Sequence, residues 1–93
     1  IEKEDLISIL EINSQLEENL NILIKGFIIS SREKLIVLTQ EGWELYFNLQ
    51  EDVKWQLAKL KALLEEKIPP EKRKNLEYIE LRFGNFANPK YKD

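Results

Sequence analysis

The side chains that most often carry out catalysis or bind transition metals are missing from this sequence. Its 93 residues contain no histidine and no cysteine. A histidine-based catalytic triad, a histidine general base and the usual imidazole and thiolate metal ligands are therefore excluded. The remaining candidates for acid–base catalysis or for binding a hard cation are three adjacent carboxylate pairs, Glu17 and Glu18, Glu51 and Asp52, and Glu65 and Glu66.

Each carboxylate pair lies in a segment with a helical pattern. Adjacent side chains on a helix diverge by about 100°, so the two members of a pair do not converge on one site. Glycine occurs only at positions 26, 42 and 84, which are too scattered for a phosphate-binding loop. We expect the carboxylates to be solvated, and we predict no catalytic residue, no cofactor and no metal site.

The charge of the chain indicates what kind of partner it has. Its 17 acidic and 14 basic residues are interspersed and give a net charge of -3, so we do not expect nucleic acid as a partner. The short basic cluster at residues 72–74 follows two prolines, and we interpret it as a solvated turn rather than as a phosphate or lipid-headgroup site. The sequence therefore predicts a binding or scaffolding domain and not an enzyme.

Two segments have the apolar spacing of amphipathic helices. The first covers residues 5–20, with Asp5 as the expected N-cap and an apolar stripe of Leu6, Ile9, Leu10, Leu16 and Leu20. The second has Glu51 and Asp52 in its first turn and the stripe Val53, Leu57, Leu60 and Leu64. It must end before Pro69 and Pro70, which have no amide donor.

Four segments have strand patterns. Residues 22–30 and 34–39 are rich in β-branched and apolar side chains, and residues 43–49 alternate between apolar and more polar side chains. Residues 76–83 alternate again, with Ile79, Leu81 and Phe83 expected on the buried face. Because Gly84, Asn85 and Pro89 follow, we expect this last strand to be a free edge of the sheet.

These elements predict one α+β domain over residues 1–93. Two helices pack on one face of an antiparallel sheet of about four strands, in the order α-β-β-β-α-β. Core packing is the expected role of Phe27, Trp43, Phe47 and Phe83. Trp55 lies off the apolar stripe of the second helix, where it either covers a neighbouring loop or belongs to a contact surface.

The last predicted strand also carries a resemblance to a known family. Its residues Tyr78, Ile79, Glu80, Leu81, Arg82, Phe83, Gly84 and Asn85 resemble the tyrosine-hydrophobe-Asp-Leu-Arg-aromatic segment near the C-terminus of FtsQ/DivIB cell-division proteins. The segment from Thr39 to Trp43, the alternating strand and the helix with leucines at 57, 60 and 64 are similar to the region before that segment. Two departures are Glu80 in place of the family's aspartate and the break at residues 86–89.

This resemblance implies a non-enzymatic scaffold of the bacterial divisome. The parent protein would be a single-pass protein of the cell membrane, with a POTRA domain followed by this β-domain on the extracytoplasmic side. It would bind the coiled-coil proteins FtsB/DivIC and FtsL, and the terminal strand and nearby helix would receive a partner strand at the sheet edge. The positions that match the motif and that we expect to bind the partner are Tyr78, Arg82, Phe83 and Asn85.

Other features of the chain bear on these expectations. The longest apolar run, residues 35–38, is far shorter than the ~20 residues of a spanning helix. Methionine does not occur, so we expect the 93 residues to be a fragment of a larger, membrane-anchored protein. An alternative function is a peptide-binding or chaperone module of a POTRA-containing transport or outer-membrane assembly protein, which would also use an exposed strand edge.

Overall fold

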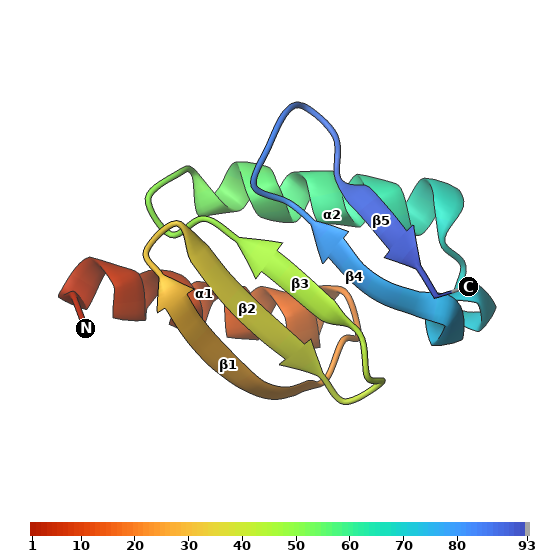
Figure 1. Cartoon of the computed structure of the whole chain (residues 1–93), viewed down its shortest axis with the longest axis horizontal. Helices are drawn as coiled ribbons and strands as arrows, with labels where there is room; N and C mark the ends of the chain where they lie inside the picture. The colour runs from red at the N-terminus through yellow and green to blue at the C-terminus, as the bar shows by residue number, and fades with distance from the viewer. Residues whose placement is uncertain (93) are drawn as a thin grey trace.

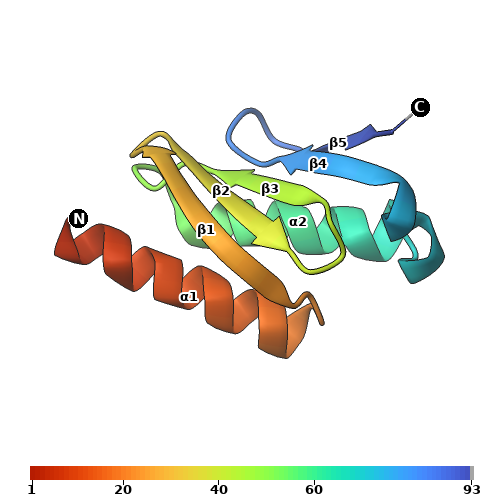
Figure 2. The same ribbon diagram turned by 60° about the horizontal axis from the view of Figure 1, so that its bottom comes forward.

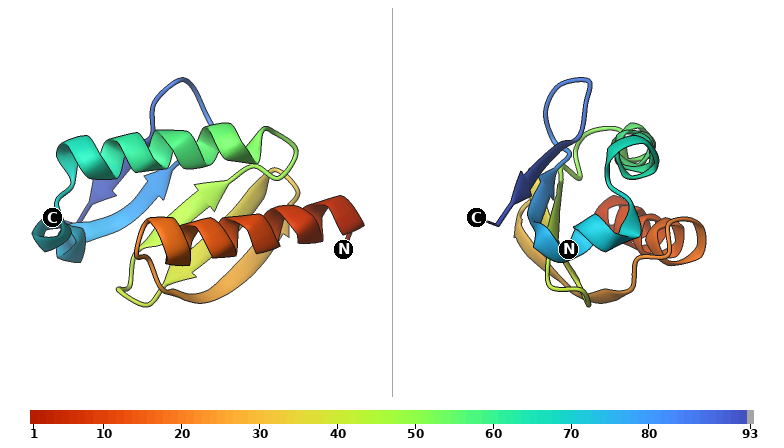
Figure 3. Two further views of the ribbon diagram at one scale, coloured as in Figure 1. Left: turned by 180° about the vertical axis from the view of Figure 1, so that it is seen from behind. Right: turned by 90° about the vertical axis from the view of Figure 1, so that its right-hand side faces the viewer.

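A computed structural model describes residues 1–92, which form two α-helices, a short 3-10 helix and a five-stranded sheet (Figure 1). The elements are α1 (Lys3–Asn19), β1 (Ile24–Ser31), β2 (Lys34–Thr39), β3 (Glu44–Phe47), α2 (Val53–Lys67), η1 (Pro70–Asn75), β4 (Leu76–Glu80) and β5 (Asn88–Tyr91). Both helices lie on the same face of the sheet, α1 under the β1 side and α2 under the β5 side (Figures 2 and 3). The predicted α+β class, the element order and the one-sided helix packing are confirmed.

The sheet differs from the prediction in its pairing. Its strand order is β1-β2-β3-β4-β5, and β3 and β4 run parallel while the other neighbours are antiparallel. The cause is the connection between these two strands. Helix α2 carries the chain back along the sheet, so β4 starts from the same end as β3, as in any crossover connection through a helix. The sheet is therefore mixed rather than antiparallel.

A further correction concerns the edge of the sheet. We predicted that residues 76–83 form an edge strand, but the chain turns back after Glu80 and β5 pairs with β4 in antiparallel register, with Ile79 opposite Pro89. Strand β4 is therefore interior, and β5 is the C-terminal edge. Pro89 does not prevent this pairing because an edge strand needs amide donors on only one side.

Helix α1 also differs from the prediction at its N-terminus and in its buried face. It begins at Lys3, and the Asp5 side chain is not a cap but is buried, where its carboxylate pairs with Arg32 in the β1–β2 turn at 2.9 Å. The buried stripe continues through Ile9, Ile12 and Leu16. Leu6 and Leu10, which we expected in the core, are 46% and 58% exposed. A shift of the stripe by one or two residues rotates the helix enough to exchange these positions.

Helix α2 has the expected position and a well-formed start. The Asp52 carboxylate accepts hydrogen bonds from the backbone N–H groups of Lys54 and Trp55, at 2.9 and 3.2 Å, which is an N-cap. Its buried face packs on the sheet and includes two polar residues, Gln56 and Lys59. The Gln56 amide bonds to both backbone groups of Asn48, so it fixes the loop before the helix.

The core lies between the helices and the sheet. It contains the inward-facing residues of the central strands, among them Leu35, Val37, Leu45, Phe47 and Ile79, which are fully buried. Trp43 and Phe47 are buried as predicted, and Phe27 packs against the core while remaining partly exposed. Phe83 is 59% exposed, so its predicted core position is wrong. The reason is that β4 ends at Glu80 and the alternation does not continue to residue 83. Within residues 1–92, neither helix has the length and apolar composition to cross a membrane.

Candidate partner-binding site

The C-terminal edge of the sheet presents a short row of main-chain groups. The N–H of Lys92 donates to the C=O of Asn75 at 2.7 Å, so the N–H groups of Lys92, and of alternate residues before it in β5, face β4. The groups of Pro89 and Tyr91 therefore face outward. Because proline has no N–H, this edge offers the C=O of Pro89 and both the N–H and C=O of Tyr91. These three groups define one register for an added strand.

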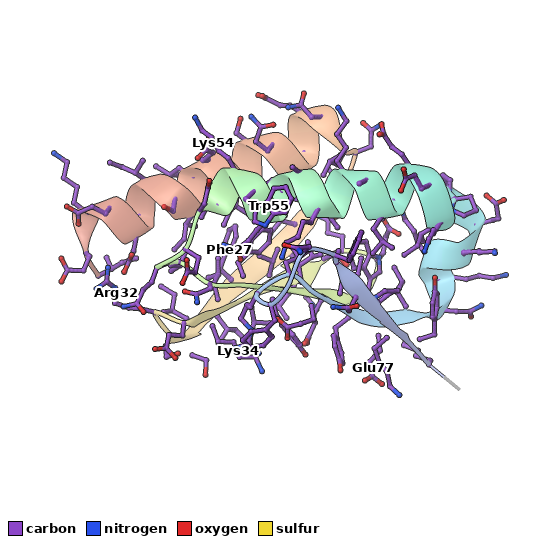
Figure 4. All side chains as sticks on the ribbon, turned by 90° about the horizontal axis from the view of Figure 1, so that it is seen from above. Phe27, Arg32, Lys34, Lys54, Trp55 and Glu77 are labelled. Carbon is purple, nitrogen blue, oxygen red and sulfur yellow. The ribbon has the colours of Figure 1, made fainter. Side chains whose placement is uncertain are left out.

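A groove adjoins this edge on the helix side of the sheet. It has a volume of about 780 Å³ and runs between α2 and the segment from Asn85 to Tyr91. Its walls are mainly apolar or aromatic, with Trp55, Ala62 and Leu63 from α2 and Phe86, Pro89 and Tyr91 from the opposite side. Trp55, which is labelled in Figure 4, lies in the first turn of α2. It is 49% exposed, Phe86 is 78% exposed and Tyr91 is 37% exposed. Exposed aromatic side chains of this kind are enriched in protein interfaces.

Lys59 connects the helix wall of the groove to the opposite loop. Its ammonium donates to the C=O of Leu81 at 2.8 Å and to the C=O of Gly84 at 3.1 Å, and the residue is only 6% exposed. Burial lowers the pKa of Lys59, and the negative charge of Glu80 acts in the opposite direction. The two hydrogen bonds hold the start of the β4–β5 loop against α2, which sets the shape of the groove.

The structure separates the four predicted partner-binding residues. Asn85 is exposed and lines the groove. Phe83 is in the exposed loop, where the Arg82 guanidinium lies 4.7 Å from the centre of its ring. Tyr78 and Arg82 lie on the outer face of the sheet, opposite the helices. Only Asn85 therefore lines the groove. Tyr78 and Arg82 lie on the opposite face of the sheet, and Phe83 lies in the loop after β4.

The outer face around Tyr78 is held by contacts among its own residues. The rings of Tyr46 and Tyr78 stack at 4.8 Å, and the Lys34 ammonium lies 4.4 Å from the centre of the Tyr46 ring. The Tyr46 hydroxyl donates to Glu44 at 3.1 Å. Burial, followed by this hydrogen bond, raises the pKa of Tyr46 to about 12. The Tyr46 ring is therefore already in contact with two neighbouring side chains.

Arg82 is also more constrained than an exposed arginine. Its Nε and Nη2 donate to the Glu80 carboxylate at 2.8 and 3.0 Å, in a two-point pair whose side chains are 18% and 17% exposed. The hydrogen bond to Glu80 is the main cause that raises the pKa of Arg82. A third contact reaches the C=O of Glu33 at 3.5 Å. Arg82 therefore links β4 to the β1–β2 turn.

Sequence reasoning missed two parts of the groove. Lys59 has a usable signal, because it follows Gln56 by three residues and precedes Leu63 by four, so it lies beside the apolar stripe. Tyr91 and Phe86 have no such sequence signal, because their position depends on the chain turning back after Glu80. Trp55, for which two roles were open, lies in the groove wall. The three carboxylate pairs are not brought together, and within residues 1–92 no group of three acidic side chains is placed to hold a metal ion.

The chain has no match among known family models or curated proteins. Any function must therefore be argued from the residues and the geometry of this edge.

Proposed function

We propose that this domain is a non-enzymatic scaffold of the bacterial divisome that receives an extended segment of a partner protein at its C-terminal sheet edge. The observation that carries the proposal is the free edge of β5 beside an apolar groove on α2. Addition of a strand to a sheet edge takes affinity from main-chain hydrogen bonds and specificity from pockets for alternate side chains. The β5 edge supplies the main-chain groups, and the groove supplies the pocket for side chains.

The identity of the partner rests on the resemblance of residues 78–85 to FtsQ/DivIB proteins. In that family the terminal strand and a nearby helix receive a partner strand, and here the terminal strand β5 and helix α2 border one groove. We therefore propose FtsB/DivIC-like and FtsL-like coiled-coil proteins as partners. The parent protein would be anchored in the cell membrane with this domain on the extracytoplasmic side. Tyr78, Arg82, Phe83 and Asn85 are proposed to contact the partner, with Asn85 inside the groove.

The proposal is tested by mapping the binding surface in solution. The ¹⁵N-labelled domain is titrated with the extracytoplasmic segment of an FtsB/DivIC-like protein from the same organism, and amide shifts are followed by NMR. We expect the largest shifts in β5, in α2 and in the loop between β4 and β5. Trp55→Ala should weaken binding at least about tenfold, since buried aromatic anchors carry much of the energy of an interface.

The matched control is Lys61→Ala, an exposed residue of the same helix that lines the groove between α1 and α2 instead. It should bind like the parent domain. Shifts confined to β1, or equal binding of Trp55→Ala, would contradict the proposal. A domain that binds scrambled segments as tightly as the native one would instead be the peptide-binding or chaperone module.

A further inference from the structure

Lys59 is a buried cation without a carboxylate partner. Within residues 1–92 the ion pairs join Asp5 to Arg32, Glu41 to Arg73 and Glu80 to Arg82, and none includes Lys59. Its two acceptors are neutral carbonyls. Buried charges in proteins are normally paired, because an unpaired charge in a poorly hydrated site is costly. Lys59 therefore holds the β4–β5 loop through hydrogen bonds to neutral groups, while its charge has no ion-pair partner among residues 1–92.

The position of Lys59 would also allow its charge to interact with a segment bound in the groove. The side chain lines the α2–β5 groove, which Asn85 and Phe86 also line. An ammonium has three donors, and the carbonyls of Leu81 and Gly84 account for two of them. The third donor has no hydrogen-bond acceptor among residues 1–92. Glu66 and Lys67, which also line it, are exposed residues near the end of α2.

We propose, on the basis of the strand-binding function above, that the segment bound in the α2–β5 groove carries a carboxylate side chain that pairs with Lys59. The other side chains directed into the groove would be apolar, to match Trp55, Phe86 and Tyr91. A strand places every second side chain on one face, so the bound segment would alternate, with an acidic residue replacing one apolar residue of the inward set. Lys59 is thus the specificity-determining residue of the site.

The physical reason is that the Lys59 side chain is already largely removed from solvent before the partner arrives. The protein has borne the cost of burying the ammonium during folding, so binding adds the attraction without that part of the desolvation penalty. A neutral isostere such as glutamine accepts a hydrogen bond from the ammonium but carries no negative charge, so it lacks the ion-pair attraction. The site should therefore distinguish Glu from Gln more strongly than a solvated lysine would.

The test uses a displayed library of random linear peptides, selected against the folded domain and, in parallel, against Lys59→Met and Lys61→Met. Methionine keeps much of the side-chain volume and removes the charge, and the exposed Lys61 is the matched control. We expect the parent domain and Lys61→Met to enrich alternating peptides with Asp or Glu at one fixed position. Lys59→Met should enrich peptides without this acid. Thermal melts establish that each variant is folded at the selection temperature.

A second measurement does not depend on the folding of any variant. The best peptide and its Glu→Gln form are titrated into the parent domain by calorimetry, and the glutamine form should bind at least about tenfold more weakly, equivalent to about 1.4 kcal/mol. If Lys59→Met is folded, the two peptides should bind it within about twofold of each other. The two peptides and the two proteins form a double-mutant cycle, which isolates the interaction between Lys59 and the peptide glutamate. A purely structural role of Lys59 would weaken both peptides equally.

The outcomes separate the two proposals. Peptides that shift β5 and α2 resonances but contain no fixed acidic residue, or that tolerate the glutamine exchange, would overturn the role of Lys59 and leave strand addition intact. A library that yields no peptide at β5 would overturn strand addition and the role of Lys59 together.

Discussion

The two edge strands of the sheet differ in the features that limit their pairing with another strand. The β1 edge has eight residues and no proline, and its pairing with β2 is interrupted by register shifts near each end, between Ile24 and Gly26 and between Ile29 and Ser31. The β5 edge has four residues, one of which is Pro89. Bulges, short edge strands and prolines are all means by which natural sheets avoid unwanted pairing. The β1 edge strand is long and itself carries the extra residues of its two register shifts. The β5 edge strand is short, and the one register shift of its pairing places the extra residue, Glu77, on β4.

This difference indicates which edge is suited to selective binding. On β1 the irregular register leaves no long run of evenly spaced donors and acceptors. On β5 the missing N–H of Pro89 leaves one arrangement of outward-facing main-chain groups. The groove beside this strand would contact the side chains of an added strand. The short β5 edge beside the groove is therefore suited to selecting a partner, whereas the interrupted β1 edge is protected from regular pairing.

The largest expected effect comes from removing the single outward N–H of β5. Tyr91→Pro should leave the hydrogen bonds of its neighbours to β4 in place, because the N–H of residue 91 faces away from β4. It should weaken binding of the partner segment about a hundredfold. A partner carbonyl left unpaired costs about 1–3 kcal/mol, and the Tyr91 ring is lost as well. Tyr91→Val is the control for the loss of the ring, and it should weaken binding of the partner segment about tenfold. Calorimetry that finds the two variants equal would place the added strand elsewhere.

A second effect tests the region between the edges. Replacing an ordinary surface arginine changes stability by less than about 0.5 kcal/mol. The structure shows a two-point pair with Glu80, so the substitution brings two carboxylates together on a partly buried surface. We expect a loss of about 2 kcal/mol, and less for Arg82→Gln, measured by urea unfolding. Equal stability of both variants and the parent would show that the pair contributes nothing.

The Arg82→Glu variant also sharpens the limits of the site. If it still binds the partner segment normally while folded, the outer face of β4 is not part of the interface. Binding weakened at least about tenfold would bring that face into the site, as the resemblance to FtsQ/DivIB implies.

The stacked tyrosines in the middle of the sheet give a smaller, pH-dependent effect. The pKa of Tyr46 is raised to about 12 in the folded protein, from 10.0. Its contribution to stability is fully present below pH 10 and is lost as the pH rises toward the folded value. Between about pH 9 and about pH 11 the parent should lose roughly 1 kcal/mol more than Tyr46→Phe. Parallel curves for the two proteins would show that Tyr46 ionises normally.

Much of the fold followed from residue patterns. The alternation of Leu45 and Phe47 with Glu44 and Tyr46 predicted a strand with one buried face, and the two prolines after α2 marked where that helix must end. The patterns did not give the direction of β4 relative to β3, because alternation is the same for parallel and antiparallel strands. They also did not give β5, since four residues that include Pro89 and are all exposed have no apolar periodicity.

The candidate site was harder to predict for the same reason. Asn85 was identified through the motif, and it does line the groove. The groove itself exists because β5 folds back and brings Phe86 and Tyr91 opposite Trp55, which are far apart in sequence. No local pattern contains that information.

The smallest expected effect is at the other edge. Ile28 is 47% exposed in β1, and its replacement by lysine adds to this strand the kind of charge that often protects edges. Ile28→Lys should change stability by only about 0.5 kcal/mol, because the side chain is already half in solvent and a lysine can extend its stem over the sheet. It should not change the affinity for the partner segment, because β1 and β5 are at opposite ends of the sheet. Tyr91→Lys, the equivalent change at β5, should weaken binding. If Ile28→Lys were the variant that lost binding, β1 would be the receiving edge and the contrast between the two edges would be reversed.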